Sequence, residues 1–216
     1  ALQGEAEAHG AMFAFNPAFQ QARKLDGVFI VNASGRSGET SELTSRALVN
    51  CAGHGAHDVA AKVKGYPLEK RPPRYLAKGS YCGVSGISPF KHLIYPVPVP
   101  GALGIHATLD LAGAVRLGPD IQWLDEFDYS MPPGLPEKFI AAVQAYWPGV
   151  RDRALTPSYC GIRPKIHGPH ESFADFEIQQ RGAHGVAGLI NLFGVESPGL
   201  TASLAIAEFV QRGLRS

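Results

Sequence analysis

The sequence has only three cysteines among 216 residues, and Cys51, Cys82 and Cys160 lie far apart. An odd number of widely spaced cysteines does not suit a disulfide framework, so we expect reduced thiols. Long apolar runs are also missing. None approaches the roughly 20 residues that cross a bilayer, and the start, ALQGEAEAHG, lacks the charged and apolar regions of a signal peptide. We therefore expect a cytoplasmic protein without a transmembrane segment.

An excess of charge is absent too, because 20 basic residues balance 19 acidic ones and leave a formal charge of +1. Without a basic cluster, no nucleic-acid partner is expected. The histidine pairs His54/His57 and His167/His170 lack an HExxH or CxxC framework, so no metal is expected. The hydrophobic residues, 45% of the chain, are enough to bury a core in one or two domains.

Apolar and glycine patterns divide the chain into three parts. In residues 1–64, a helix and an edge strand precede two β-favouring runs, GVFIVNASG and SRALVNCAG, which the polar loop SGRSGETSE joins into a predicted meander. The next run, AHDVAAKVKG, has the composition of a helix and ends at a glycine.

Residues 65–159 contain short β-rich runs broken by Gly and Pro, which predict an antiparallel sheet. The segment GLPEKFIAAVQAYWPG places its apolar residues at helical spacing, so it should cover this sheet. Residues 160–216 return to strands and end in an amphipathic helix, TASLAIAEFVQRGL. The predicted fold class is mixed α/β and α+β.

The stretch NLFGVESPGLTASLAIAE, residues 191–208, predicts a strand, a Gly-Pro turn and a helix. Backbone N–H groups at a helix start lack partners and favour a negatively charged ligand, although an ordinary turn also needs glycine. A second strand, turn and helix carries Gly53 and Gly55, but Asp58 stands where a GxGxxG motif needs a small residue. These 216 residues therefore contain no primary nucleotide fingerprint.

Five motifs occur in an order that resembles the carboxyl-terminal part of the FAD-dependent oxidoreductases of the D-amino-acid oxidase superfamily, nearest to the L-2-hydroxyglutarate dehydrogenase/oxidase branch. They are VNCAG, LIYPVPVPGALGIHATLD, GPDIQW, YCGIRPKI and NLFGVESPGLTASLAIAE. In that family an amino-terminal βαβ unit carries GxGxxG, and this sequence is expected to begin after it. The resemblance implies the remainder of a Rossmann-like FAD-binding domain, residues 1–64 and 160–216, with an inserted substrate domain at 65–159.

The resemblance also implies which residues contact the flavin. The N–H groups of Gly199, Leu200 and Thr201 would stabilise negative charge on the reduced flavin, within a turn that also contains Gly194 and Ser197. Ala52 and Gly53 would lie against the flavin at the end of another strand. For these two residues, a purely conformational need for glycine is the alternative.

Oxidation of a 2-hydroxy acid requires a carboxylate-binding group and a base for the hydroxyl proton. Arg163 in GIRPK matches the family's carboxylate-binding arginine, and a structural ion pair is its alternative role. Lys165 would share its strand face. His106 in GIHAT matches the family histidine that faces the substrate, and its alternative is packing. Lys78 and Tyr81 are expected to line the same pocket, although Tyr81 equally fits sheet packing.

The sequence therefore predicts an FAD-dependent oxidoreductase that transfers hydride from a small carboxylate substrate, a 2-hydroxy acid of the L-2-hydroxyglutarate kind, to the flavin. O₂ or a quinone would be the electron acceptor. An amino acid is the alternative substrate, because the carboxylate-binding group is shared. A catalytically inactive fragment or interaction module, without the FAD pyrophosphate site, is the third hypothesis.

Overall fold

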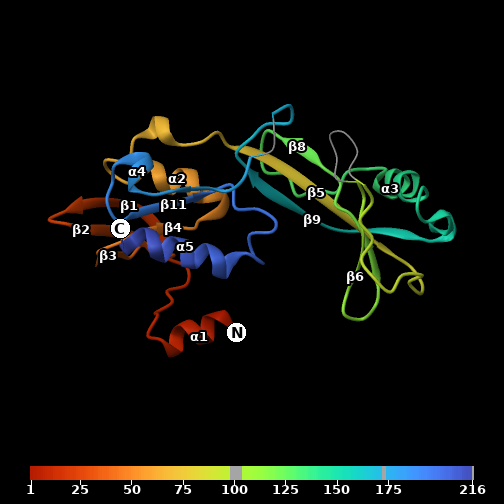
Figure 1. The fold of residues 1–216 in the computed structure, drawn as a ribbon, viewed down its shortest axis with the longest axis horizontal. Helices are drawn as coiled ribbons and strands as arrows, with labels where there is room; N and C mark the ends of the chain where they lie inside the picture. The colour runs from red at the N-terminus through yellow and green to blue at the C-terminus, as the bar shows by residue number, and fades with distance from the viewer. Residues whose placement is uncertain (98–103, 172–173, 216) are drawn as a thin grey trace. The chain divides into compact units, whose positions relative to one another are not determined.

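The computed structural model describes residues 1–97, 104–171 and 174–215. The chain forms two compact units. The first contains Ala1–Pro72, Phe176–Phe193 and Ser197–Ser216, and the second contains Pro73–Asp175 and Gly194–Glu196 (Figure 1). The chain thus enters the second unit after residue 72 and leaves it after residue 175, apart from Gly194–Glu196, whereas the sequence placed the two domain boundaries at 65 and 160. Within the described ranges, no helix is long and apolar enough to cross a membrane.

An antiparallel sheet follows helix α1 (Leu2–Ala8) in the first unit. Its strands are β1 (Ala18–Leu25), β2 (Val28–Ser34) and β3 (Thr40–Ser45), in that spatial order. Asp26 and Gly27 join β1 to β2, and both have positive φ angles, of 50° and 85°, which suits a two-residue hairpin. The expected edge strand directly after Gly10 is wrong, because the first strand begins at Ala18. The predicted loop is also partly wrong, because it contains the start of β3.

A second sheet in this unit joins distant parts of the sequence. Strand β11 (Leu189–Phe193) lies between β10 (Glu177–Gln179), which is antiparallel to it, and β4 (Leu48–Asn50), which is parallel to it. The predicted meander is therefore wrong in its pairing, because β4 pairs with β11 instead of β2. Besides α1, the described helices of this unit are η1 (Gly53–Gly55), α2 (Ala56–Ala61), η2 (Leu68–Lys70), α4 (Arg181–His184) and α5 (Ser203–Arg215).

The second unit contains the expected antiparallel sheet. Two long strands, β5 (Tyr75–Val84) and β9 (Leu155–Lys165), run side by side (Figure 1). The other edge of β5 pairs with β7 (Val115–Leu117) and β8 (Gln122–Leu124), and β6 (Ala107–Leu109) pairs with β7. Of the expected strand HLIYPVPV, the described residues show one bridge, from Ile94 to Ala107. The last two residues of this motif lie outside the described ranges.

Helix α3 (Leu135–Val143) packs against this sheet, as its apolar spacing predicted. Phe139, Val143 and Trp147 are buried in a core that also contains Cys82 and Leu117 from the strands. The α-helix ends at Val143, and the short helix η3 (Pro148–Asp152) follows. Since side chains alternate along a strand, the residues between the core positions point to the opposite face of the sheet.

Candidate functional site

Four of the predicted substrate residues lie on the sheet face opposite helix α3. Tyr81 pairs with Tyr159, and Arg163 and Lys165 follow on the same face of β9 at two-residue steps. His106 precedes Ala107, which is buried in the core, so its side chain lies on this face too. We call this surface, formed by Tyr81, His106, Tyr159, Arg163 and Lys165, the basic face.

A buried carboxylate joins the two cations of β9. Glu196 accepts a hydrogen bond from Nη1 of Arg163 at 3.1 Å through Oε2, and its Oε1 lies 2.5 Å from Nζ of Lys165. The Glu196 side chain is 8% exposed, against 30% for Arg163. The three residues carry a net charge of about +1, which leaves this group able to bind an anion. The expected shared face of Arg163 and Lys165 is confirmed, and Glu196 was missed by the sequence reasoning.

Two stacked tyrosines continue the basic face. The rings of Tyr81 and Tyr159 lie 4.5 Å apart at an interplanar angle of 13°. Burial, together with the nearby Tyr159, raises the pKa of the Tyr81 phenol, and this outweighs the opposing effect of Arg163. Tyr81 therefore keeps its proton at neutral pH and can donate a hydrogen bond to an anionic ligand.

His106 is half-buried just before β6. Its ring lies 4.1 Å from the ring of Tyr95 in an edge-to-face arrangement. Its carbonyl oxygen accepts a hydrogen bond from the Gly118 amide at 3.0 Å. Gly118 has a φ of 133°, and an added Cβ would lie 2.6 Å from the Ser80 carbonyl oxygen and from Cδ1 of Tyr81. Only glycine therefore lets this backbone pass so close to Tyr81.

Lys78 lies on the opposite face of β5 from Tyr81, so the structure does not place the two in one pocket. The Lys78 side chain is 1% exposed, and its Nζ donates to Oδ2 of Asp128 and to the Ser130 carbonyl oxygen, both at 2.9 Å. Hydrogen bonds from Ser130 and Lys78 hold the pKa of Asp128 well below its usual range. The buried Lys78 therefore forms an ion pair with Asp128, which is a structural role.

The residues expected at the flavin occupy loops after two parallel strands. Ala52 and Gly53 follow β4, and Gly194 follows β11, whose carboxyl end lies at the same sheet edge. Ligands bind at such edges in open parallel sheets. Gly53 has a φ of 56° and nothing within 4 Å of the position of a Cβ, so its backbone is open to a ligand. Buried Asn50 fixes this strand end by bonding the Ala56 carbonyl at 2.8 Å.

The turn after β11 differs from the expectation in one respect. Helix α5 begins at Ser203, so Gly199, Leu200 and Thr201 lie in a turn before it and not in its first helical turn. The turn leads into the helix through a bond from the Ala202 amide to the Pro198 carbonyl oxygen at 3.0 Å. Ser197, Leu200 and Thr201 are exposed. This surface fits contact with a ligand, although a contribution from the helix dipole is weaker at this distance.

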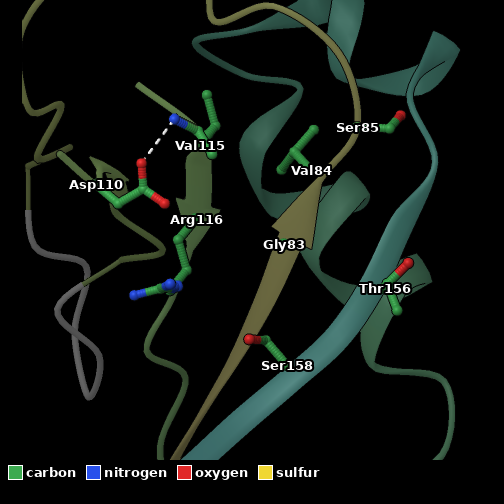
Figure 2. A pocket seen from close by; sticks show the side chains of 9 residues that line it. Gly83, Val84, Ser85, Asp110, Val115, Arg116, Thr156 and Ser158 are labelled. Atoms are coloured by element: carbon green, nitrogen blue, oxygen red, sulfur yellow. Dashed lines mark hydrogen bonds between the residues drawn. The ribbon is translucent and has the colours of Figure 1, made fainter. Parts of the chain in front are cut away.

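A pocket of about 310 Å³ opens beside strands β5, β7 and β9 (Figure 2). The sequence reasoning did not identify it, because its walls come from four separate segments. The residues that line it are Gly83, Val84, Ser85, Asp110, Ala114, Val115, Arg116, Thr156 and Ser158.

Comparison with known proteins identifies the class to which this fold belongs. Residues 1–212 match the DAO family, described as FAD-dependent oxidoreductases, and the chain belongs to this family. A relative is the mitochondrial L-2-hydroxyglutarate dehydrogenase of Arabidopsis thaliana, which is 42% identical over 229 residues, 97% of this chain and 47% of the relative. The chain thus spans about half the length of this relative, and the resemblance predicted from the sequence is confirmed.

Solved structures share the fold. The FAD-bound L-α-glycerophosphate oxidase of Mycoplasma pneumoniae has a TM-score of 0.77 at 21% identity, covering 100% of this chain and 54% of that protein. The FAD complex of the glycerol-3-phosphate dehydrogenase of Bacillus halodurans has a TM-score of 0.66 at 20% identity, covering 96% and 40% respectively. This chain has mixed α/β structure with antiparallel sheets, as predicted, and it shares this fold with FAD-dependent oxidoreductases.

Proposed function

We propose that this chain supplies the substrate site and part of the flavin site of an oxidoreductase that converts a small 2-hydroxy acid, of the L-2-hydroxyglutarate kind, to the 2-oxo acid. The observation that carries this proposal is the basic face, where Arg163, Lys165 and Tyr81 lie together with His106 on one side of the sheet. Relatedness to a dehydrogenase of that substrate supports it.

Four residues of the basic face have a role in this reaction. Arg163 and Lys165 bind the carboxylate next to the reacting carbon, while Glu196 neutralises one of the two cations and holds them in place. The protonated Tyr81 donates a further hydrogen bond. His106 accepts the hydroxyl proton as the carbon–hydrogen bond breaks. Bound FAD would supply the hydride acceptor, so the substrate loses one proton and one hydride, which together amount to two protons and one electron pair.

The first unit is proposed as the remainder of the Rossmann-like FAD-binding domain. Its parallel pair of β4 and β11 supports this assignment, because the loops beyond their carboxyl ends present exposed backbone. Ala52, Gly53 and the turn of Gly194, Ser197, Gly199, Leu200 and Thr201 would hold the flavin there. The second unit would be the substrate domain.

Two alternatives follow from the same face. An amino acid carries the same carboxylate, so it competes as a substrate and differs only at the α-substituent. An inactive fragment or interaction module would retain the fold without turnover. The electron acceptor, O₂ or a quinone, and the cytoplasmic location stay predictions.

Anaerobic titration of the FAD-loaded protein that contains this chain tests the proposal. L-2-hydroxyglutarate should bleach the flavin absorbance, while L-glutamate, which has an amine at the same carbon, should not. Bleaching by L-glutamate alone would favour the amino-acid alternative. No bleaching by either acid, in a protein with stoichiometric FAD, would favour the inactive module.

A further inference from the structure

Arg116 on β7 lies beside the basic face, and no role has yet been given to it. It pairs with Gly83 of β5 and alternates with the buried core residues Val115 and Leu117, so its side chain belongs to the same sheet face as Tyr81. Its guanidinium carbon lies 5.2 Å from the ring centroid of Tyr159. The stacked pair of tyrosines thus has a cation at each end, Arg116 at one and Arg163 at the other.

The two arginines differ in their partners. Arg163 is neutralised in part by Glu196, whereas within the described ranges Arg116 has no carboxylate in ion-pair distance. The nearby Asp110 lines the same pocket (Figure 2), but its Oδ1 accepts hydrogen bonds from the amides of Ala112 and Ala114, both at 2.9 Å. A half-buried guanidinium that packs on an aromatic ring and has no carboxylate in ion-pair distance is a strong binding group for an anion.

The surroundings of Arg116 also suit a carboxylate. The pocket beside it is lined by the hydroxyl-bearing Thr156 and Ser158, which can donate hydrogen bonds. Tyr159 and Arg163 are four positions apart, about 13 Å along an extended strand. Arg116 lies at the Tyr159 end of this interval and Arg163 at the other. A short dicarboxylic acid fits between them when both arginine side chains extend toward it.

We propose that Arg116 binds the distal carboxylate of a dicarboxylic 2-hydroxy acid, while Arg163 and Lys165 bind the carboxylate next to the reacting carbon. This assignment rests on the proposed function and adds a reason for the substrate choice. Arg116, Arg163, Lys165 and Glu196 together carry a net charge of about +2, which matches a dianion. Arg116 would therefore be the residue that separates dicarboxylic from monocarboxylic substrates.

The test compares L-2-hydroxyglutarate with L-2-hydroxyvalerate, in which a methyl group replaces the distal carboxylate. In the FAD-loaded protein, Arg116→Gln should lower kcat/KM for L-2-hydroxyglutarate by about 10- to 100-fold, the value of a charge-assisted hydrogen bond. The value for L-2-hydroxyvalerate should change by less than about 2-fold. Arg116→Lys keeps the charge and should retain a preference for the dicarboxylate. Arg151→Gln, at an exposed arginine of η3, is the matched control and should change neither value.

Calorimetric binding of glutarate and of valerate gives a second readout that needs no turnover. Arg116→Gln should weaken only glutarate binding. Equal losses for both ligands, or no loss for glutarate, would overturn the assignment while leaving the proposed function intact. If the unmodified protein oxidises neither hydroxy acid, the proposed function fails, and glutarate binding alone then decides the role of Arg116.

Discussion

Arg163→Met separates a substrate-binding role for Arg163 from a purely structural one. Methionine keeps an apolar stem of similar length but removes the charged fork, so the net charge of the group with Lys165 and Glu196 falls from about +1 to zero. A charge-assisted hydrogen bond to a desolvated carboxylate contributes about 2 to 3 kcal/mol. The apparent affinity for L-2-hydroxyglutarate should therefore weaken by about 30- to 150-fold.

The effect on stability should be small by comparison. Glu196 keeps Lys165 as a partner at 2.5 Å, so its buried carboxylate is not left alone. Glu196→Gln provides the matched variant, because it removes the carboxylate and leaves both cations unneutralised. We expect Glu196→Gln to lower the melting temperature more than Arg163→Met does.

Substrate titration and thermal unfolding, both on one FAD-loaded preparation, test these expectations. If Arg163 serves only the ion pair, Arg163→Met will melt at a lower temperature and bind substrate normally. That result would refute the role in carboxylate binding and leave this role to Lys165.

Three further predictions follow from the second unit. His106→Ala should slow flavin reduction by roughly 10² to 10⁴-fold with the cofactor still bound, as measured by rapid mixing, and an unchanged rate would return His106 to a packing role. Asp128→Asn should lower the melting temperature more than Lys78→Met does, because it leaves the buried Lys78 ammonium without its carboxylate partner. Since the folded-state pKa of Asp128 lies below the ordinary 3.8, the stability that this ion pair contributes should be lost as the pH falls below about 4. An acid titration in which Asp128→Asn loses as much stability as the unmodified protein would contradict this. Gly118→Ala should cost about 1 to 3 kcal/mol of unfolding free energy and perturb Tyr81, because the added Cβ would clash with the Ser80 carbonyl oxygen and the Tyr81 ring. Gly113→Ala, at a positive φ with open space around it, should cost less. Equal losses of the two variants in denaturant unfolding would contradict the close contact at Gly118.

Local patterns predicted the parts of the fold that depend on local interactions. The helical spacing of Phe139 and Val143 correctly identified the face of α3 that packs against the sheet, and Trp147, just beyond the helix, is buried in the same core. The pairing of β4 with β11 was missed, because strand composition does not tell which distant strand is the partner. The first half of the polar strand β3 was assigned to a loop, since the first five residues of this strand are exposed and carry no apolar alternation.

The candidate site shows the same limit, with one avoidable error. Arg163 and Lys165 are two residues apart, so their shared face followed from the strand period. The same period places Lys78 and Tyr81, three apart, on opposite faces, which the sequence reasoning overlooked. Glu196 gave no sequence signal beyond an acidic residue before a Pro-Gly turn. Its role depends on a contact with β9 that only the folded structure shows.

Transient kinetics with L-2-hydroxyglutarate deuterated at the α-carbon tests the central claim most directly. If the FAD-loaded protein takes hydride from the α-carbon while His106 takes the hydroxyl proton, deuteration should slow flavin reduction without changing the binding step. Flavin that stays oxidised with this acid, or flavin reduction in which the α-hydrogen is retained in the product, would contradict the claim.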